Sequence, residues 1–280
     1  MGDLLEKDTR LDDVLALDDT AYNALLKGIY PLSKSKISAY GFCPYQFALR
    51  YLKGIKSEPS FKMVIGTRFH HFAEKFFDGI KEVEDWTKLI HEDYSPFEKD
   101  MLSWFISMEY ARFDIFKNNP EQYQPFIREV DIYNNDVRVH GFVDRVDYII
   151  PELIPYMEGE VSPTAIRKIV KHLDAGKPVL CPVEYKTGDS FNANSMKHEL
   201  SIYKQCLQGD PRYKDYFVGC GCYINPKLKK IQYLVLERDE TTRAKVDAVY
   251  KHIQNRVFPR VCTPGKYEAC RLCKIEDTFN

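Results

Sequence analysis

The sequence lacks any apolar run that approaches the roughly 20 residues needed to cross a bilayer. It also lacks the basic start that precedes the apolar stretch of a secretory signal, because its first residues are rich in Asp and Glu. Internal repeats and low-complexity segments are missing as well, which excludes a repeat array and a disordered chain. We therefore expect a soluble, cytoplasmic protein with no membrane contact.

A strong net charge is missing too. Lys and Arg total 40 and Asp and Glu total 41, so the net charge of -1 gives no global argument for nucleic acid as a partner. Acidic residues are concentrated in residues 1–20, however, and the remaining body is weakly basic. Such a body could bind a polyanion through a local groove, with an affinity that falls as salt rises. Aromatic residues reach 14%, which leaves rings for stacking on bases or for core packing.

The hydrophobic pattern predicts helices first and strands later. Apolar residues recur at helical intervals from Met63 to about Val83 and from Pro96 to Lys117, whereas from Ile127 the period is two, with a turn at Asn134-Asn135-Asp136. We expect a mixed α/β fold with a central mixed sheet flanked by helices. The expected parts are an acidic N-terminal leader helix (1–36), a helical region (37–126), a core (127–257) with an insertion (152–178) and a Cys-containing C-terminal segment (258–280). The core strands and helices after the hairpin are expected at 179–186, 194–208, 217–225, 230–237 and 239–257.

Two short motifs in the core carry ionisable residues. Gly141-Phe142-Val143-Asp144 lies on one predicted strand, and Glu184-Tyr185-Lys186 lies on another. Glu184 and Lys186 are two residues apart, so on a strand they project from the same face. If the strand of Asp144 lies beside them, two carboxylates could hold Mg²⁺ or Mn²⁺ and the Lys cation could assist phosphodiester hydrolysis. The alternative is an ordinary solvated strand face with alternating charges.

A histidine on the helix predicted from Met63 to about Val83 extends this pattern. His70 follows Gly66 in a Gly-x-x-x-His motif and shares a helix face with Glu74. A lone helical histidine is more often a packed or exposed residue than a metal ligand. A zinc hydrolase that uses His70, His71 and Glu74 is a third possibility, but the H-E-x-x-H arrangement is lacking.

The order of these motifs resembles that of RecB-type nucleases of the PD-(D/E)XK superfamily. The resemblance to RecB and AddB nuclease domains and to CRISPR-adaptation exonucleases covers residues 37–275. It implies a restriction-endonuclease-like core, with His70, Asp144, Glu184 and the Tyr185 carbonyl as ligands of Mg²⁺ or Mn²⁺ and Lys186 as the catalytic lysine. Tyr203 matches the tyrosine of the family's Gln-Tyr helix motif, which lies over the active site.

Two features depart from the family pattern. Glu199 stands four residues before Tyr203, where such proteins often have Gln. The segment between Asp144 and Glu184 is longer than the family's usual hairpin. Its extra residues form either a flap that contacts phosphates or an inert surface elaboration; the bases concerned are Arg167, Lys168, Lys171 and Lys177.

The cysteines add a further resemblance. Several RecB-type nucleases hold a 4Fe-4S cluster with one early and three late cysteines, and Cys43, Cys262, Cys270 and Cys273 are similar to that set. Here Cys262 precedes the C-x-x-C motif, whereas in the family the third late cysteine follows it. A tetrahedral zinc site and free thiols remain the alternatives. The other four cysteines are expected in the core; they are Cys181, Cys206, Cys220 and Cys222.

The resemblance implies a DNA exonuclease on single-stranded or duplex ends in recombination, repair or CRISPR-type processing, with a possible helicase or recombination partner. The alternative is a non-catalytic iron-sulfur or zinc subunit that binds DNA or supports a nuclease-helicase complex.

Overall fold

The computed structural model describes residues 11–56, 59–78 and 89–261 and divides the chain into two compact units. Unit 1 takes its described residues from Met1–Glu58, Val137–Val139 and Arg243–Asn280, and unit 2 takes them from Pro59–Asp136 and His140–Thr242. Within the described ranges, no helix combines the length and apolar character that crossing a membrane requires.

Unit 1 is built mainly of short helices. Their bounds are α1 (Leu11–Leu15), α2 (Asp19–Lys27), α3 (Lys34–Phe42), α4 (Pro44–Phe47) and a π-helical turn (Ala48–Leu52), next to the two-residue strand β1 (Leu32–Ser33). The described part of the predicted leader, residues 11–36, therefore holds two complete helices rather than one. The second begins at Asp19 because the Asp18 side chain accepts a hydrogen bond from the Ala21 amide.

The last part of α11 (Asp239–Gln254) also belongs to unit 1. Two buried hydroxyls tie this helix to the N-terminal segment. The Tyr22 hydroxyl donates to the Ile253 carbonyl over 2.7 Å, and the Leu32 amide donates to the Tyr250 hydroxyl over 3.0 Å. Segments far apart in sequence thus fold as one body.

Unit 2 contains the central mixed sheet. Strand β2 (Ile127–Asn134) pairs with β3 (Val139–Ile149), which is antiparallel to β4 (Val179–Tyr185). Strand β4 is parallel to β5 (Phe217–Val218) and β6 (Gly221–Asn225), and β6 is antiparallel to β7 (Lys230–Leu234). Every residue of β4 is buried, as expected for the central strand of a sheet with both faces covered.

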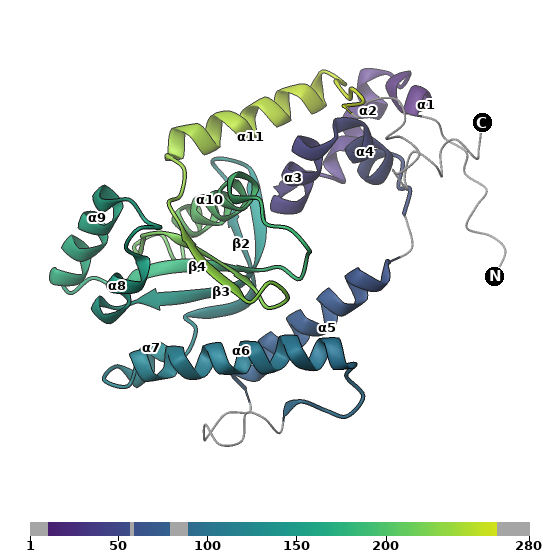
Figure 1. Ribbon diagram of the computed structural model, residues 1–280. Helices are drawn as coiled ribbons and strands as arrows, with labels where there is room; N and C mark the ends of the chain where they lie inside the picture. Colours follow the sequence, from purple (N-terminus) through teal and green to yellow (C-terminus); the bar gives the residue numbers. More distant parts are fainter. Residues whose placement is uncertain (1–10, 57–58, 79–88, 262–280) are drawn as a thin grey trace. The chain divides into compact units, whose positions relative to one another are not determined.

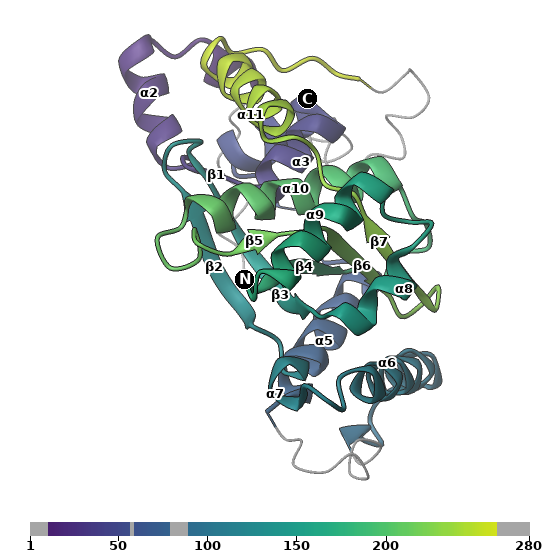
Figure 2. The same ribbon diagram turned by 90° about the vertical axis from the view of Figure 1, so that its left-hand side faces the viewer.

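Helices cover both faces of this sheet. Helix α10 (Ala193–Gly209) packs on β2, β4 and β6, whereas α5 (Phe61–Phe76) and α6 (Pro96–Ile115) lie on the opposite side (Figures 1 and 2). Residues 120–174 add the short helices α7 (Pro120–Tyr123) and α8 (Ile154–Met157), a 3-10 turn (Pro151–Leu153) and α9 (Pro163–Asp174), which packs against β4.

The helices start where side chains satisfy their first amides. Helix α6 begins with a capping box, in which the Ser95 hydroxyl accepts from the Glu98 amide and the Glu98 carboxylate accepts from the Ser95 amide. Helix α5 begins at Phe61 because the Ser60 hydroxyl accepts from the Met63 amide. Its predicted extension to Val83 partly lies outside the described residues.

The predicted mixed α/β class with a central mixed sheet flanked by helices is confirmed. The prediction of one strand over 217–225 was wrong in detail, because β5 and β6 are separate strands. Gly219 lies between them, where an added Cβ would come within 2.7 Å of the Ile169 side chain on α9.

Candidate metal and catalytic site

Asp144 and Glu184 lie at the point where β3 and β4 separate. The antiparallel pairing of these strands ends at Arg145↔Val183, and the next residue on each strand is one of the two carboxylates. Beyond this point β4 continues beside β6, while the Tyr185 amide donates to Asp144 Oδ2 over 2.9 Å. Where two neighbouring strands separate, one ligand can contact side chains of both.

Helix α5 brings His70 to this point. Its Nδ1 lies 3.5 Å from Asp144 Oδ1. Burial alone would lower the pKa of His70, but the hydrogen bond and charge of Asp144, helped by the charge of Glu184, raise it above its ordinary value. The helix can approach because residue 66 is Gly: an added Cβ there would lie 3.1 Å from Thr187 Oγ1.

A third carboxylate, which the sequence did not single out, completes a cluster of possible metal ligands. One ligand atom each from His70, Glu129 and Asp144 lie within 4.8 Å of one another. Glu129 lies in β2 with a φ of 47°, a left-handed conformation that costs a residue with a side chain roughly 1–3 kcal/mol. Burial and the charge of Asp144 raise the pKa of Glu129 to about 7. A divalent cation that binds at this carboxylate would displace such a proton into solvent.

Glu184 and Lys186 form an ion pair beside this cluster. Lys186 Nζ lies 2.5 Å from Glu184 Oε1 and 3.2 Å from Glu199 Oε2, so the lysine joins β4 to helix α10. Burial alone would lower the pKa of Lys186, but the charges of Glu184 and Glu199 raise it well above its usual value. Lys186 is therefore a fixed cation. Glu199, at the position where Gln was expected, contributes directly to holding it.

Tyr203 on α10 covers the same end of β3. Its hydroxyl donates to the Phe142 carbonyl over 2.7 Å, and its ring would collide with a Cβ on Gly141 at 2.8 Å. The glycine of the Gly-x-x-Asp motif is thus explained by the close approach of this ring. Burial, together with the charges of Glu184 and Asp144, raises the pKa of Tyr203 well above its ordinary value, so the phenol stays protonated.

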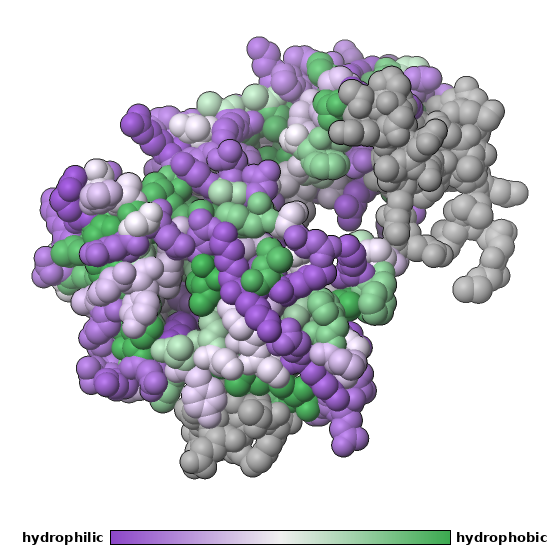
Figure 3. Space-filling view, in the orientation of Figure 1, coloured by the Kyte–Doolittle hydropathy of each residue, from purple (hydrophilic) through white to green (hydrophobic). Residues whose placement is uncertain are grey.

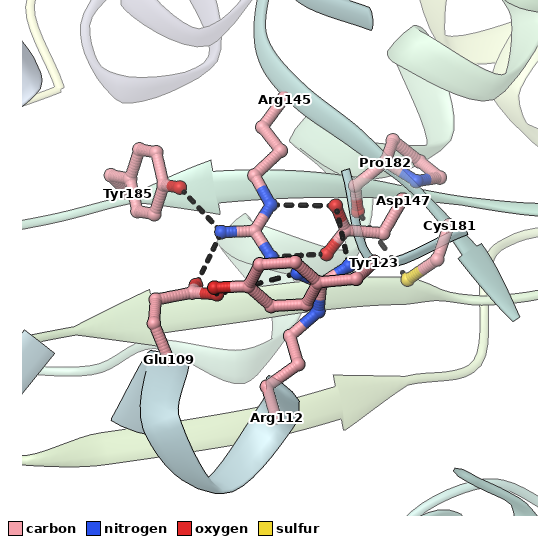
Figure 4. A network of polar contacts seen from close by, with 8 residues as sticks. All are labelled: Glu109, Arg112, Tyr123, Arg145, Asp147, Cys181, Pro182 and Tyr185. Carbon is pink, nitrogen blue, oxygen red and sulfur yellow. Dashed lines mark hydrogen bonds and ion pairs between the residues drawn. The ribbon is translucent and has the colours of Figure 1, made fainter. Parts of the chain in front are cut away.

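The opposite face of the same two strands carries a buried ionic network (Figure 4). The Arg145 guanidinium donates to both oxygens of Asp147 at 2.6 Å, to Glu109 at 2.5 Å and to the Tyr185 hydroxyl at 3.0 Å. Arg112 lies 3.3 Å from Glu109 and 3.4 Å from Asp147. Successive strand residues point to opposite faces, so Asp144 and Arg145 serve different clusters, as do Glu184 and Tyr185. The network joins β3 and β4 to helix α6 through Arg145, Tyr185 and Glu109.

The predicted cysteine ligands are only partly described. Cys43 is buried in unit 1, between α3 and α4, while Cys262, Cys270 and Cys273 lie outside the described residues. The other four cysteines are buried as predicted; they are Cys181, Cys206, Cys220 and Cys222.

A helix-flanked mixed sheet with ionisable side chains where two strands separate is consistent with the restriction-endonuclease-like fold. Residues 31–153 match the family model of the PD-(D/E)XK nuclease superfamily. The matched segment includes His70, Glu129 and Asp144 and ends before Glu184. No curated protein matches the chain.

Proposed function

We propose that this chain is a divalent-metal-dependent nuclease that hydrolyses phosphodiester bonds in DNA. The observation that carries the proposal is the convergence of His70, Glu129 and Asp144 within 4.8 Å, beside the ion pair of buried Glu184 with Lys186. The match of residues 31–153 to a nuclease superfamily supports the same chemistry.

The donor set fits a hard divalent cation. Two carboxylates and one imidazole meet at one point, and carboxylate oxygens are ligands that Mg²⁺ and Mn²⁺ prefer. We propose that His70, Asp144 and Glu129 hold the ion, with Glu184 and the Tyr185 carbonyl as further ligands. When bound, the ion would polarise the scissile phosphate and neutralise charge that develops during hydrolysis.

Three side chains beside the proposed metal ligands have roles in the proposed reaction; they are Lys186, Glu199 and Tyr203. Lys186 places a permanent cation next to the carboxylates, where it can stabilise negative charge on a phosphate in the transition state. Glu199 holds that lysine from α10. The Tyr203 hydroxyl keeps α10 against the strand of Asp144 through its bond to the Phe142 carbonyl.

The more specific part of the proposed function rests on the order of the motifs along the sequence. We propose a RecB-type exonuclease that acts on single-stranded DNA ends in recombination, repair or CRISPR-type DNA processing, in a helicase or recombination complex. A 4Fe-4S cluster or a zinc ion at Cys43, Cys262, Cys270 and Cys273 belongs to the same proposal. The absorption spectrum and metal content of anaerobically purified protein test it.

The activity is tested with end-labelled DNA, closed circular DNA and RNA in the presence of Mg²⁺ or Mn²⁺. Asp144→Asn, Glu184→Gln and Lys186→Met should each lower the rate by at least about a hundredfold. Exposed Glu121 provides the matched control, and Glu121→Gln should cleave at the wild-type rate. Full activity in all three site variants, or undiminished cleavage in excess chelator, would contradict the proposal. Cleavage of closed circles would contradict the exonuclease assignment alone.

A further inference from the structure

A hollow of about 440 Å³ lies next to the proposed catalytic site in unit 2. Its volume falls in the range of small-molecule sites, roughly 300–1,000 Å³. The beginnings of α5 and α6, the segment after β4 and the turn between β6 and β7 form its walls. The lining residues that matter are Phe61, Lys62, Ile65, Phe97, Thr187 and Lys227.

Two phenylalanine rings in this hollow are exposed. Phe61 has 75% and Phe97 has 42% of its surface accessible, and Met63 and Val64 are exposed beside Phe61 on α5. Figure 3 shows hydrophobic side chains on the surface over the beginning of α5. Single exposed apolar residues are common on protein surfaces, but rings gathered around one hollow indicate a binding site.

The rim of the hollow carries cations. Lys62 and Lys227 both form ion pairs with Asp189, and Lys227 Nζ lies 5.1 Å from the centre of the Phe97 ring. Two lysines against one aspartate leave the rim with an excess of positive charge. A ligand that fits is therefore flat and apolar where it meets the rings and anionic where it meets the lysines. A nucleotide has both properties.

The hollow adjoins the proposed catalytic residues. Thr187 follows Lys186 directly in the chain and lies against α5 at Gly66. Ile65 and His70 are five residues apart on the same helix, which corresponds to about 7.5 Å along its axis. A nucleic-acid strand with a phosphate at His70 and Asp144 would bring a neighbouring base to the phenylalanines.

We propose that Phe61 and Phe97 form a stacking subsite for an unpaired nucleobase of the strand under cleavage, with Lys62 and Lys227 next to its backbone. The subsite deepens the proposed function, on which it rests. Bases inside a duplex are already paired and stacked, so the subsite gives the enzyme a preference for single-stranded substrate near the cut.

Binding measurements separate stacking from charge. A labelled single-stranded oligonucleotide and an abasic strand of the same length are titrated with protein in a Lys186→Met background, so that the strands stay intact. Phe61→Ala/Phe97→Ala should weaken binding of the natural strand at least about fivefold and leave abasic binding unchanged. Phe61→Leu/Phe97→Leu should resemble the Ala variant, and Phe61→Tyr/Phe97→Tyr should resemble the parent.

Tyr156 is an exposed ring on α8, outside this hollow, and Tyr156→Ala is the matched control that should bind both strands like the parent. Equal affinity of the parent for natural and abasic strands would overturn the subsite, as would full binding by the Leu variant. Cleavage by the wild-type protein is measured separately. Normal cleavage without base-dependent binding refutes the subsite alone, whereas base-dependent binding without cleavage refutes the proposed function alone.

Discussion

Replacing Arg145 with Met tests the role of the buried network behind the site. The Arg145 side chain is only 1% exposed, and its partners Glu109 and Asp147 are 0% and 12% exposed. Together with Arg112 these groups form a cluster of two cations and two anions. Arg145→Met leaves two buried carboxylates with one cation. Removing one partner of a buried ion pair costs about 3–5 kcal/mol, and we expect a loss in that range.

The structure also predicts that a second substitution restores part of the stability. Asp147→Leu in the Arg145→Met background leaves one cation, Arg112, paired with one anion, Glu109, so the cluster carries no net charge. The Tyr123 hydroxyl also lies 3.3 Å from Glu109. Because charge balance returns, the double variant should be more stable than Arg145→Met alone by about 1–3 kcal/mol. The gain is a consequence of charge balance, since the second change adds no hydrogen bond.

Urea unfolding of the two single variants and the double variant forms a thermodynamic cycle. Exposed Arg167 on α9 supplies the control, since Arg167→Met should change the free energy of unfolding by less than about 0.5 kcal/mol. If the double variant loses the sum of the two single losses, the cluster does not act as a balanced unit. A loss below about 1 kcal/mol for Arg145→Met would refute the argument from burial.

Two further predictions concern pH. The pKa of Glu129 is raised from its ordinary 4.5 to about 7 in the folded protein, so the folded state keeps a proton that the unfolded state loses. Glu129 is only half-buried, so solvent screening reduces the effect. In chelator, the free energy of unfolding of the wild type relative to that of Glu129→Gln should therefore fall by about 1–2 kcal/mol as pH rises from 4.5 past 7. Unfolding curves at pH 5 and 8 measure this change, and a constant difference would contradict it. Glu199→Gln removes a charge that raises the pKa of Lys186, so the pKa of the Lys186 ammonium should fall, and an unchanged lysine pKa in an NMR titration would contradict that role.

Patterns among residues close in sequence were sufficient to predict most helices and strands of unit 2. The alternation from Ile127 and the Asn-rich turn predicted the β2–β3 hairpin, and Ser95, Pro96 and Glu98 mark the observed start of α6. These features depend on residues close in sequence, where turn and cap chemistry act directly. A period of two also predicted that Glu184 and Lys186 share a face, whereas the adjacency of the strands of Asp144 and Glu184 was only a condition of the predicted site and is seen in the pairing of β3 with β4.

Glu129 could not be predicted in this way. On an alternating strand it looks like any exposed glutamate, whereas in the structure it has a positive φ and a carboxylate oxygen within 4.8 Å of ligand atoms of His70 and Asp144. A carboxylate on the strand that pairs with a proposed ligand strand was the available signal. Glu109 was hidden for a different reason. It lies on a helix 36 residues before Arg145, and nothing in the local pattern of α6 indicates a buried ionic partner.

The alternation of strand residues explains why a costly ionic cluster lies directly behind the site. Asp144 and Arg145 are adjacent, as are Glu184 and Tyr185, so each proposed catalytic side chain has a neighbour that belongs to the network on the other face. A metal site needs its ligands held within about 0.5 Å, and directional hydrogen bonds fix strand register more strictly than apolar packing does. An apolar cluster could match the stability. The ladder of β3 and β4 sets the register as far as Arg145↔Val183, so what the network adds is a set of directional contacts directly behind the two carboxylates, where that ladder ends.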